Sequence, residues 1–203
     1  MIRIAVFASG TGSNAQKIID YFTRNPSLSG PEVQGNKNIR VTLIVCNKPG
    51  AGVLGIAAKA NIETLLIEKE KFFRGNAYTD ELKEKQINFI ALAGFLWKIP
   101  PRLVKAYPRM IVNIHPALLP AYSGKGMYGV HVHEAVLHAK DASSGITIHY
   151  VDEHYDNGDI IFQAKCEITP TDTPQSLAEK IHRLEHEYYP RIIEKEINGQ
   201  KHA

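Results

Sequence analysis

Short apolar runs alternate with amphipathic segments through the first 115 residues of the chain. Apolar runs that end at turn-forming residues predict buried strands. Between them, apolar residues recur at helical spacing, as at Ala15, Ile18, Ile19 and Phe22. The predicted strands cover residues 2–8, 39–46, 63–67, 89–93 and 110–115, and the predicted helices cover residues 14–24, 52–60 and 77–86. Strands that alternate with helices indicate right-handed crossovers and a mostly parallel sheet.

The pattern changes after residue 120. Residues 121–130 are rich in Gly and Tyr and predict a loop, and a helix is expected at 131–139. Two β runs, 146–151 and 160–168, are separated by too few residues for a crossover helix, so they predict an antiparallel pair. A long helix is expected at 173–196, with Thr173 as N-cap and Pro174 in the first helical position. The whole pattern predicts an α/β fold with a mostly parallel, doubly wound, Rossmann-like sheet, helices on both faces and a C-terminal antiparallel strand pair.

Length and charge narrow the class of protein. The chain has 203 residues, enough for a single α/β domain with a substantial core, and its formal net charge is only +3. The basic residues are scattered, so we expect no nucleic-acid partner. No apolar run approaches the about 20 residues that span a bilayer, so we expect no membrane partner either. Cys46 and Cys166 lie in apolar runs and are expected to be reduced, and the first residues do not resemble a signal peptide. A cytoplasmic location follows as an expectation.

The segment most suggestive of chemistry is Asn113-Ile114-His115-Pro116-Ala117-Leu118-Leu119-Pro120. It follows an apolar run, and Pro116 must end the strand. Side chains at i and i+2 of a strand point the same way, so Asn113 and His115 should share one face. The carboxyl ends of strands in open α/β sheets are where such folds bind ligands. An amide donor beside a group that titrates near neutrality suits a reaction in which a proton moves and negative charge develops on an oxygen.

A glycine-rich loop joins the first predicted strand to the first predicted helix. Its sequence is Ser9-Gly10-Thr11-Gly12-Ser13-Asn14. Backbone N–H groups in such a loop can bind a phosphate at a helix N-terminus, although a tight βα turn would use the same residues. Gly10, Gly12 and Ala15 also fit a dinucleotide-binding fingerprint, but the second strand ends at Asn47 without the carboxylate that a ribose hydroxyl requires. A monophosphate is therefore the better ligand.

Three other groups of polar residues have both functional and structural interpretations. His182-Arg183-Leu184-Glu185-His186 matches a zinc-binding pattern, but a polar helix face is favoured, and Arg183 and Glu185 could instead serve a polar ligand. The only candidates that follow for the third zinc ligand are Glu187, Glu194, Glu196 and His202. His131 and His133 would diverge on a helix, so cap or core roles are favoured over metal binding. Asp152, Asp156 and Asp159 crowd one connection, where aspartates usually form turns. One of them could instead contact His115 and raise its pKa, but spacing does not indicate which.

Together, these segments resemble the glycinamide ribonucleotide formyltransferase family of folate-dependent formyltransferases. The likeness rests on the glycine loop, the Asn113–Pro120 segment and the Glu185-His186 pair. It rests also on Ala91-Leu92-Ala93-Gly94-Phe95-Leu96 and on Asp152-Glu153-His154-Tyr155-Asp156-Asn157-Gly158. These segments occur in the family's order and span nearly the whole chain. Trp97, Lys98 and His182 stand where other side chains are expected in the family, and the 121–130 segment is longer than in its shortest members.

The resemblance implies a reaction and a set of residue roles. The formyl group of 10-formyltetrahydrofolate, the co-substrate, would pass to the amine of glycinamide ribonucleotide in purine biosynthesis, without a metal. Asn113 would stabilise the oxyanion, His115 would act as an imidazolium, and Asp156 would keep it charged. Gly12, Ser13 and Asn14 would bind the phosphate, and Glu185 would bind the sugar or the glycinamide. The folate would contact Leu96, Trp97, Lys98, Ile99, Asn113 and Val151, with Arg74 on its glutamate tail.

The same resemblance implies how the domain is divided. One formyltransferase domain would cover residues 1–203, with a phosphate-binding half at 1–110 and a catalytic and folate-binding half at 111–203. A deformylase that passes the formyl group to water and a non-catalytic module that binds a nucleotide phosphate remain as alternatives. A methionyl-tRNA formyltransferase and a dinucleotide-dependent dehydrogenase are disfavoured by the low basicity and by Asn47. A monomer and a homodimer are both compatible with the sequence.

Overall fold

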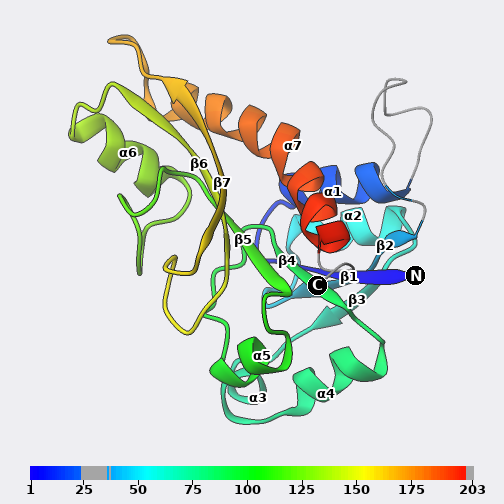
Figure 1. The fold of residues 1–203 in the computed structure, drawn as a ribbon. Helices are drawn as coiled ribbons and strands as arrows, with labels where there is room; N and C mark the ends of the chain where they lie inside the picture. The colour runs from blue at the N-terminus through cyan, green and yellow to red at the C-terminus, as the bar shows by residue number, and fades with distance from the viewer. Residues whose placement is uncertain (24–35, 37, 200–203) are drawn as a thin grey trace.

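The computed structural model describes residues 1–23, 36 and 38–199, and it contains one seven-stranded sheet in that part of the chain (Figure 1). The strands lie in the order β3-β2-β1-β4-β5-β6-β7. Their bounds are β1 Ile2–Ala8, β2 Ile39–Cys46, β3 Glu63–Leu66, β4 Phe89–Leu92, β5 Ile111–His115, β6 Ser143–Tyr150 and β7 Ile160–Glu167. The first five strands pair in parallel, whereas β6 pairs antiparallel with both β5 and β7.

The strand order reverses at β1, which has β2 on one side and β4 on the other. Reversal points of this kind open a crevice at the carboxyl ends of the strands. The segments that leave β1 and β4 stay together there, because the Ser9 N–H donates to the Gly94 carbonyl and the Leu96 N–H donates to the Ser9 hydroxyl. The glycine loop therefore opens at this edge, with only β4 between its strand and β5.

Helices cover both faces of the sheet (Figure 1). One face packs against α1 Ser13–Thr23, α2 Gly52–Lys59, α6 Val130–His138 and α7 Pro174–Gly199, and the other packs against α3 Lys69–Arg74, α4 Ala77–Glu84 and α5 Pro101–Ala106. Along β1, Ile4 and Val6 contribute to the first core, while Ala5 and Phe7 contribute to the second. A strand buried on both faces reads as a continuous apolar run, which explains the sequence pattern.

The predicted fold class is confirmed, and most elements lie where the pattern placed them. The six-residue helices α3 and α5 were not predicted, because so short a helix shows no clear periodicity. Strand β6 begins three residues before the expected start, because Ser143 to Gly145 pair with β7 although their composition is typical of a turn. Helix α1 was expected to end at residue 24, which lies outside the described residues. No helix in the described part of the chain is long and apolar enough to cross a membrane.

Candidate active site

Asn113 and His115 lie at the carboxyl end of β5 and share one face of the sheet. Their neighbours Val112 and Ile114 are buried in the core on the opposite face. Strand β6 runs antiparallel alongside, and it places His149 opposite Asn113 and Thr147 opposite His115. The amide and the imidazole therefore sit side by side at the edge where ligands are expected, as the i, i+2 spacing predicts.

Asp156 is the carboxylate that reaches this pair. It lies in the β6–β7 connection in a left-handed backbone conformation, with φ of 48°. Its Oδ1 accepts a hydrogen bond from the Asn113 amide at 3.3 Å, and its Oδ2 lies 3.6 Å from His115 Nδ1 and accepts the Gly124 N–H at 3.2 Å. Asp152 accepts hydrogen bonds from its own turn, and Asp159 pairs with Arg109. The structure thus brings one of the three aspartates to the histidine.

The environment of His115 favours the neutral ring. The side chain is only 3% exposed, and its Nε2–H donates to the Tyr122 carbonyl at 2.8 Å. Burial lowers the pKa of His115, and the nearby His149 adds to that effect, so that together they outweigh the opposing influence of Asp156 and of the Tyr122 carbonyl. The expectation that a carboxylate would leave His115 with a raised pKa, as an imidazolium, is therefore wrong for the free protein, because desolvation dominates.

Asp156 remains a carboxylate. Burial alone would raise its pKa, but the neighbouring imidazoles of His149 and His115 and the hydrogen bond from the Gly124 N–H together lower it. The cluster in the free protein therefore pairs a carboxylate with a neutral imidazole. Such a pair can accept a proton.

His149 is a buried member of this cluster that sequence reasoning missed. Its Nδ1–H donates to the Tyr150 carbonyl at 2.8 Å, and its Nε2 lies 3.1 Å from the Asn113 amide nitrogen and 3.7 Å from Asp156 Oδ1. It thereby fixes the orientation of the Asn113 amide. One signal was available in the sequence: Thr147 and His149 are polar residues at i, i+2 spacing within an otherwise apolar strand, and such residues face a shared polar neighbour.

The glycine loop passes directly into α1, which begins at Ser13. Gly12 has φ of +88°, and a Cβ there would lie 2.9 Å from Val53, so only glycine fits where the loop passes α2. The first-turn N–H groups of α1 lie at this loop, which is the arrangement that binds anions. The predicted phosphate-binding residues Gly12, Ser13 and Asn14 are therefore contiguous at one helix N-terminus.

Glu185 joins that loop from the far end of the chain. It is 5% exposed on α7, and its Oε2 accepts a hydrogen bond from the Asn14 side chain at 2.9 Å. Burial raises the pKa of Glu185 to about 7, and the Asn14 hydrogen bond only partly opposes this. Two predicted ribonucleotide contacts that lie 171 positions apart are thus in direct contact.

The predicted folate contacts are only partly brought together. Leu96 is an exposed apolar residue, and the Trp97 ring packs 5.8 Å from the rings of both Phe72 and Phe73. Lys98 Nζ lies 5.9 Å above the ring of Tyr155, next to Asp156.

Three further predicted folate contacts are buried or already have partners within the protein. Ile99 is buried in the core beneath α5, so its side chain is not available at the surface. Val151 is half-buried, and its N–H donates to the Ile111 carbonyl on β5. The Arg74 side chain is 80% exposed and pairs with Glu70 at 3.7 Å. Arg74 therefore already has an acidic partner on its own helix.

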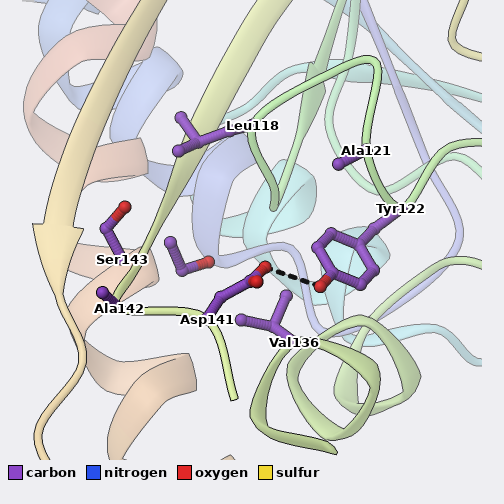
Figure 2. Close-up of a pocket in the computed structure, with 8 residues that line it drawn as sticks. Leu118, Ala121, Tyr122, Val136, Asp141, Ala142 and Ser143 are labelled. Atoms are coloured by element: carbon purple, nitrogen blue, oxygen red, sulfur yellow. Dashed lines mark hydrogen bonds between the residues drawn. The ribbon is translucent and has the colours of Figure 1, made fainter. Parts of the chain in front are cut away.

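A cavity of about 250 Å³ adjoins Tyr122, between the 118–122 segment and the start of β6 (Figure 2). The Tyr122 hydroxyl donates to Asp141 at 2.6 Å, shown as the dashed line in Figure 2. None of the predicted catalytic or binding residues lines this cavity, whose lining residues are Leu118, Ala121, Tyr122, Val136, Asp141, Ala142, Ser143 and Ser144. Tyr122 connects the cavity to the site, because its carbonyl accepts the His115 hydrogen bond.

The histidines considered as metal ligands have other environments. The rings of His182 and His186 stack with an interplanar angle of 8°, and His133 is buried on α6. Among residues 1–23, 36 and 38–199, no group of three or more His, Cys, Asp or Glu side chains is arranged to hold a metal ion.

Comparison with known proteins gives a consistent result. The family model described as formyl transferase matches residues 2–193. The chain is 39% identical over 196 residues to the chloroplastic phosphoribosylglycinamide formyltransferase of Arabidopsis thaliana, covering 94% of this chain and 64% of that protein. It is 36% identical over 197 residues to the phosphoribosylglycinamide formyltransferase of Bacillus subtilis, covering 95% of this chain and 93% of that protein.

A solved structure shares the fold. The crystal structure of glycinamide ribonucleotide transformylase 1 from Geobacillus kaustophilus superposes with a TM-score of 0.81 and 39% identity, covering 96% of this chain and 98% of that chain. The chain spans less than two thirds of the length of the plant relatives, at 64% and 60%.

Proposed function

The chain belongs to the formyl transferase family, and from that membership we propose that it transfers the formyl group of 10-formyltetrahydrofolate to the amine of glycinamide ribonucleotide. The products are N-formylglycinamide ribonucleotide and tetrahydrofolate, and the reaction belongs to purine biosynthesis. The observation that carries the proposal is the convergence of Asn113, His115 and Asp156 at the carboxyl end of β5. The names of the relatives supply the acceptor and the transferred formyl group, whereas the folate donor follows from the family resemblance.

Asn113 is oriented for the oxygen of the formyl group. Attack by the amine on the formyl carbon makes that oxygen negative, and a fixed N–H donor stabilises the charge. In the free protein the two N–H groups of the Asn113 amide point to Asp156 and His149, so one of them must leave its partner to donate to the formyl oxygen. The longer of these two contacts, the one to Asp156 at 3.3 Å, is the weaker bond and the one more readily exchanged for the formyl oxygen.

His115 and Asp156 handle the protons. The amine loses a proton as its bond to the formyl carbon forms, and N10 of the folate gains one as its bond to that carbon breaks. Nδ1 of neutral His115 faces Asp156, while Nε2–H is held by the Tyr122 carbonyl. The free Nδ1 lone pair can therefore accept the amine proton, and the Asp156 carboxylate stabilises the imidazolium that forms.

The opposite end of the ribonucleotide fits the glycine loop. The phosphate would accept hydrogen bonds from the N–H groups of Gly12, Ser13 and Asn14, where the dipole of α1 favours a negative charge. Glu185 would accept hydrogen bonds from the sugar hydroxyls or from the glycinamide, and it is already oriented by Asn14. Anchoring the substrate at a distance from the reacting amine supplies the positioning that the reaction needs.

The residues beside β5 fit the folate. An exposed Leu96, the aromatic ring of Trp97 and the Lys98 ammonium offer apolar, stacking and cationic contacts to an aromatic, anionic ligand. When bound, 10-formyltetrahydrofolate supplies the activated formyl group. The division into halves at residue 110, the cytoplasmic location and the choice between monomer and homodimer stay predictions, and no metal is part of the proposal.

The test is formyl transfer from 10-formyltetrahydrofolate, measured with and without glycinamide ribonucleotide. Asn113→Ala should reduce kcat by about 10²–10³-fold, the usual effect of removing a stabilising donor. His115→Ala and Asp156→Asn should reduce it by about 10²-fold or more, because they remove the proton acceptor and the carboxylate that supports it. His131→Ala is the matched control, because His131 is an exposed histidine on α6. Release of tetrahydrofolate without the ribonucleotide would instead indicate a deformylase. Ribonucleotide binding without any transfer would indicate the non-catalytic module.

A further inference from the structure

A second hollow in the molecule lies outside the cluster at the end of β5. It is the cavity of about 250 Å³ between the 118–122 segment, α6 and the start of β6 (Figure 2). None of the residues proposed for either substrate lines it. Sites for drug-sized ligands usually measure about 300–1,000 Å³. The cavity therefore suits a ligand of a few non-hydrogen atoms, smaller than the ribonucleotide or the folate.

Ser144 supplies this cavity with a buried hydroxyl that has no partner. The residue is only 2% exposed, it lines the cavity, and its Oγ makes no hydrogen bond to any of the described residues. Its strand pairing with Cys166 on β7 does not account for the hydroxyl, because strands pair through the main chain. A buried hydroxyl left unpaired is unfavourable, and most such groups in proteins have a partner. Ser144 therefore points to a polar group in the cavity.

Asp141 adds a negative charge to the same cavity. Its Oδ2 accepts the Tyr122 hydroxyl at 2.6 Å, whereas no hydrogen bond from the described part of the chain reaches its Oδ1 (Figure 2). None of the described residues that line the cavity is basic. The carboxylate therefore has one oxygen to offer to a cation with N–H donors, and it would repel an anion.

Apolar side chains form much of the remaining lining. Leu118 and Val136 are the largest of them, and Ala121 and Ala142 are the others. Walls of this kind favour a short hydrocarbon group, because its burial removes apolar surface from water. One small cavity thus combines a carboxylate, an unpaired hydroxyl and apolar walls.

We propose that this cavity binds a small primary ammonium, whose N–H groups donate to Asp141 and Ser144 and whose hydrocarbon part packs against Leu118 and Val136. An ammonium has three N–H donors and no acceptor, so it can serve both oxygens at once. Binding at this cavity does not require the formyl transfer proposed above, and it uses none of the residues assigned to that reaction.

The experiment compares three probes that share an isopropyl group: isobutylammonium, isobutanol and isobutyrate. Each is titrated at neutral pH into the unsubstituted, isotopically labelled protein, and the dissociation constant is taken from the shifts of backbone amide NMR signals. Isobutylammonium should bind about tenfold more tightly than isobutanol, the effect expected of one hydrogen bond between charged groups, and isobutyrate should not bind. The shifts should be largest at residues 141–144 and at Leu118 and Val136.

Three variants test the polar groups one at a time. Ser144→Ala should weaken binding of isobutylammonium about tenfold without lowering the free energy of unfolding, because none of the described residues bonds to the hydroxyl. Asp141→Asn keeps the size of the side chain and should remove the preference for isobutylammonium over isobutanol. Glu134→Gln removes an exposed carboxylate of α6 and is the matched control, which should change neither dissociation constant.

Four results would overturn the site. The first is the absence of saturable binding, and the second is equal affinity for isobutylammonium and isobutanol in the unsubstituted protein. The third is a loss of stability in Ser144→Ala with binding unchanged, which would give the hydroxyl a structural role. The fourth is a set of shifts centred on Asn14 or Asp156, which would place the cation in the substrate site. Formyl transfer is measured separately, so each of these results leaves the proposed function intact.

Discussion

The ring of His115 is held by the main chain of Tyr122: its Nε2–H donates to the Tyr122 carbonyl at 2.8 Å. Seven positions of sequence separate the two residues, and the bond closes the segment that contains Pro116 and Pro120. Because one ring nitrogen is occupied, Nδ1 is the atom left to exchange protons beside Asp156. The identity of the proton-accepting nitrogen therefore depends on how this loop is held.

The lowered pKa of His115 predicts where activity is lost in acid. The pKa of His115 in the folded protein lies below the ordinary value of 6.5, so the ring stays neutral until the pH falls to this lowered pKa. If neutral His115 accepts the amine proton, the acid limb of kcat/KM, which reports the free enzyme, should lie below pH 6.5. A limb above pH 6.5 would contradict the prediction. Asp156→Asn should shift the limb to still lower pH, because Asp156 opposes the effect of burial.

Because of Glu185, we expect folding stability to fall as the pH rises. Its folded-state pKa of about 7 exceeds the ordinary value of 4.5, so between these pH values the unfolded chain ionises this group while the folded protein keeps it protonated. Folding stability should therefore be lost from pH 4.5 to 7. Glu185→Gln should raise the free energy of unfolding at pH 8 by about 1–3 kcal/mol, without an equal gain at pH 4.

Denaturant unfolding at both pH values, in the absence of ligand, measures the effect of Glu185→Gln. The same variant should raise KM for the ribonucleotide, because the carboxylate is placed to accept hydrogen bonds from it. Equal stabilisation at pH 4 and pH 8 would show that ionisation of Glu185 is not the cause.

Substitution of Gly12 should reduce both folding stability and binding of the ribonucleotide. Gly12→Ala places a methyl group 2.9 Å from Val53 at a φ of +88°, so the loop or α2 must move. We expect a loss of about 1–3 kcal/mol in the free energy of unfolding and a raised KM for the ribonucleotide, with KM for the folate unchanged. Gly10→Ala is the matched control, because a Cβ there meets nothing within 4 Å. Comparable losses in both variants would exclude the steric explanation.

Loss of the Tyr122 hydroxyl should slow catalysis, because Tyr122 lies in the loop that holds His115. Tyr122→Phe removes the hydrogen bond to Asp141 but keeps the carbonyl that holds His115. Because the exposed bond contributes only about 1 kcal/mol, stability should change little, while kcat should fall by a few fold as His115 becomes less well oriented. Single-turnover rates measure the step directly. Tyr128→Phe, on an exposed tyrosine of the same loop, should have no effect.

Much of the fold could be predicted, because both sheet faces are covered and the strands are therefore continuously apolar. The pairing of Asn113 with His115 follows from strand geometry alone. Spacing alone could not select Asp156 over Asp152 and Asp159, because the choice depends on a left-handed turn whose φ the sequence does not reveal, and only the family resemblance indicated it. The direction of the His115 pKa shift could not be predicted either, since it depends on burial as well as on the charge nearby.

Trp97 is the only tryptophan in the chain, and it packs against Phe72 and Phe73 next to Lys98. All of the indole emission of this protein therefore originates at one wall of the site proposed for the folate. Its wavelength and lifetime provide a local optical signal without any attached dye, so movement of the α3 segment against β4 can be followed in real time.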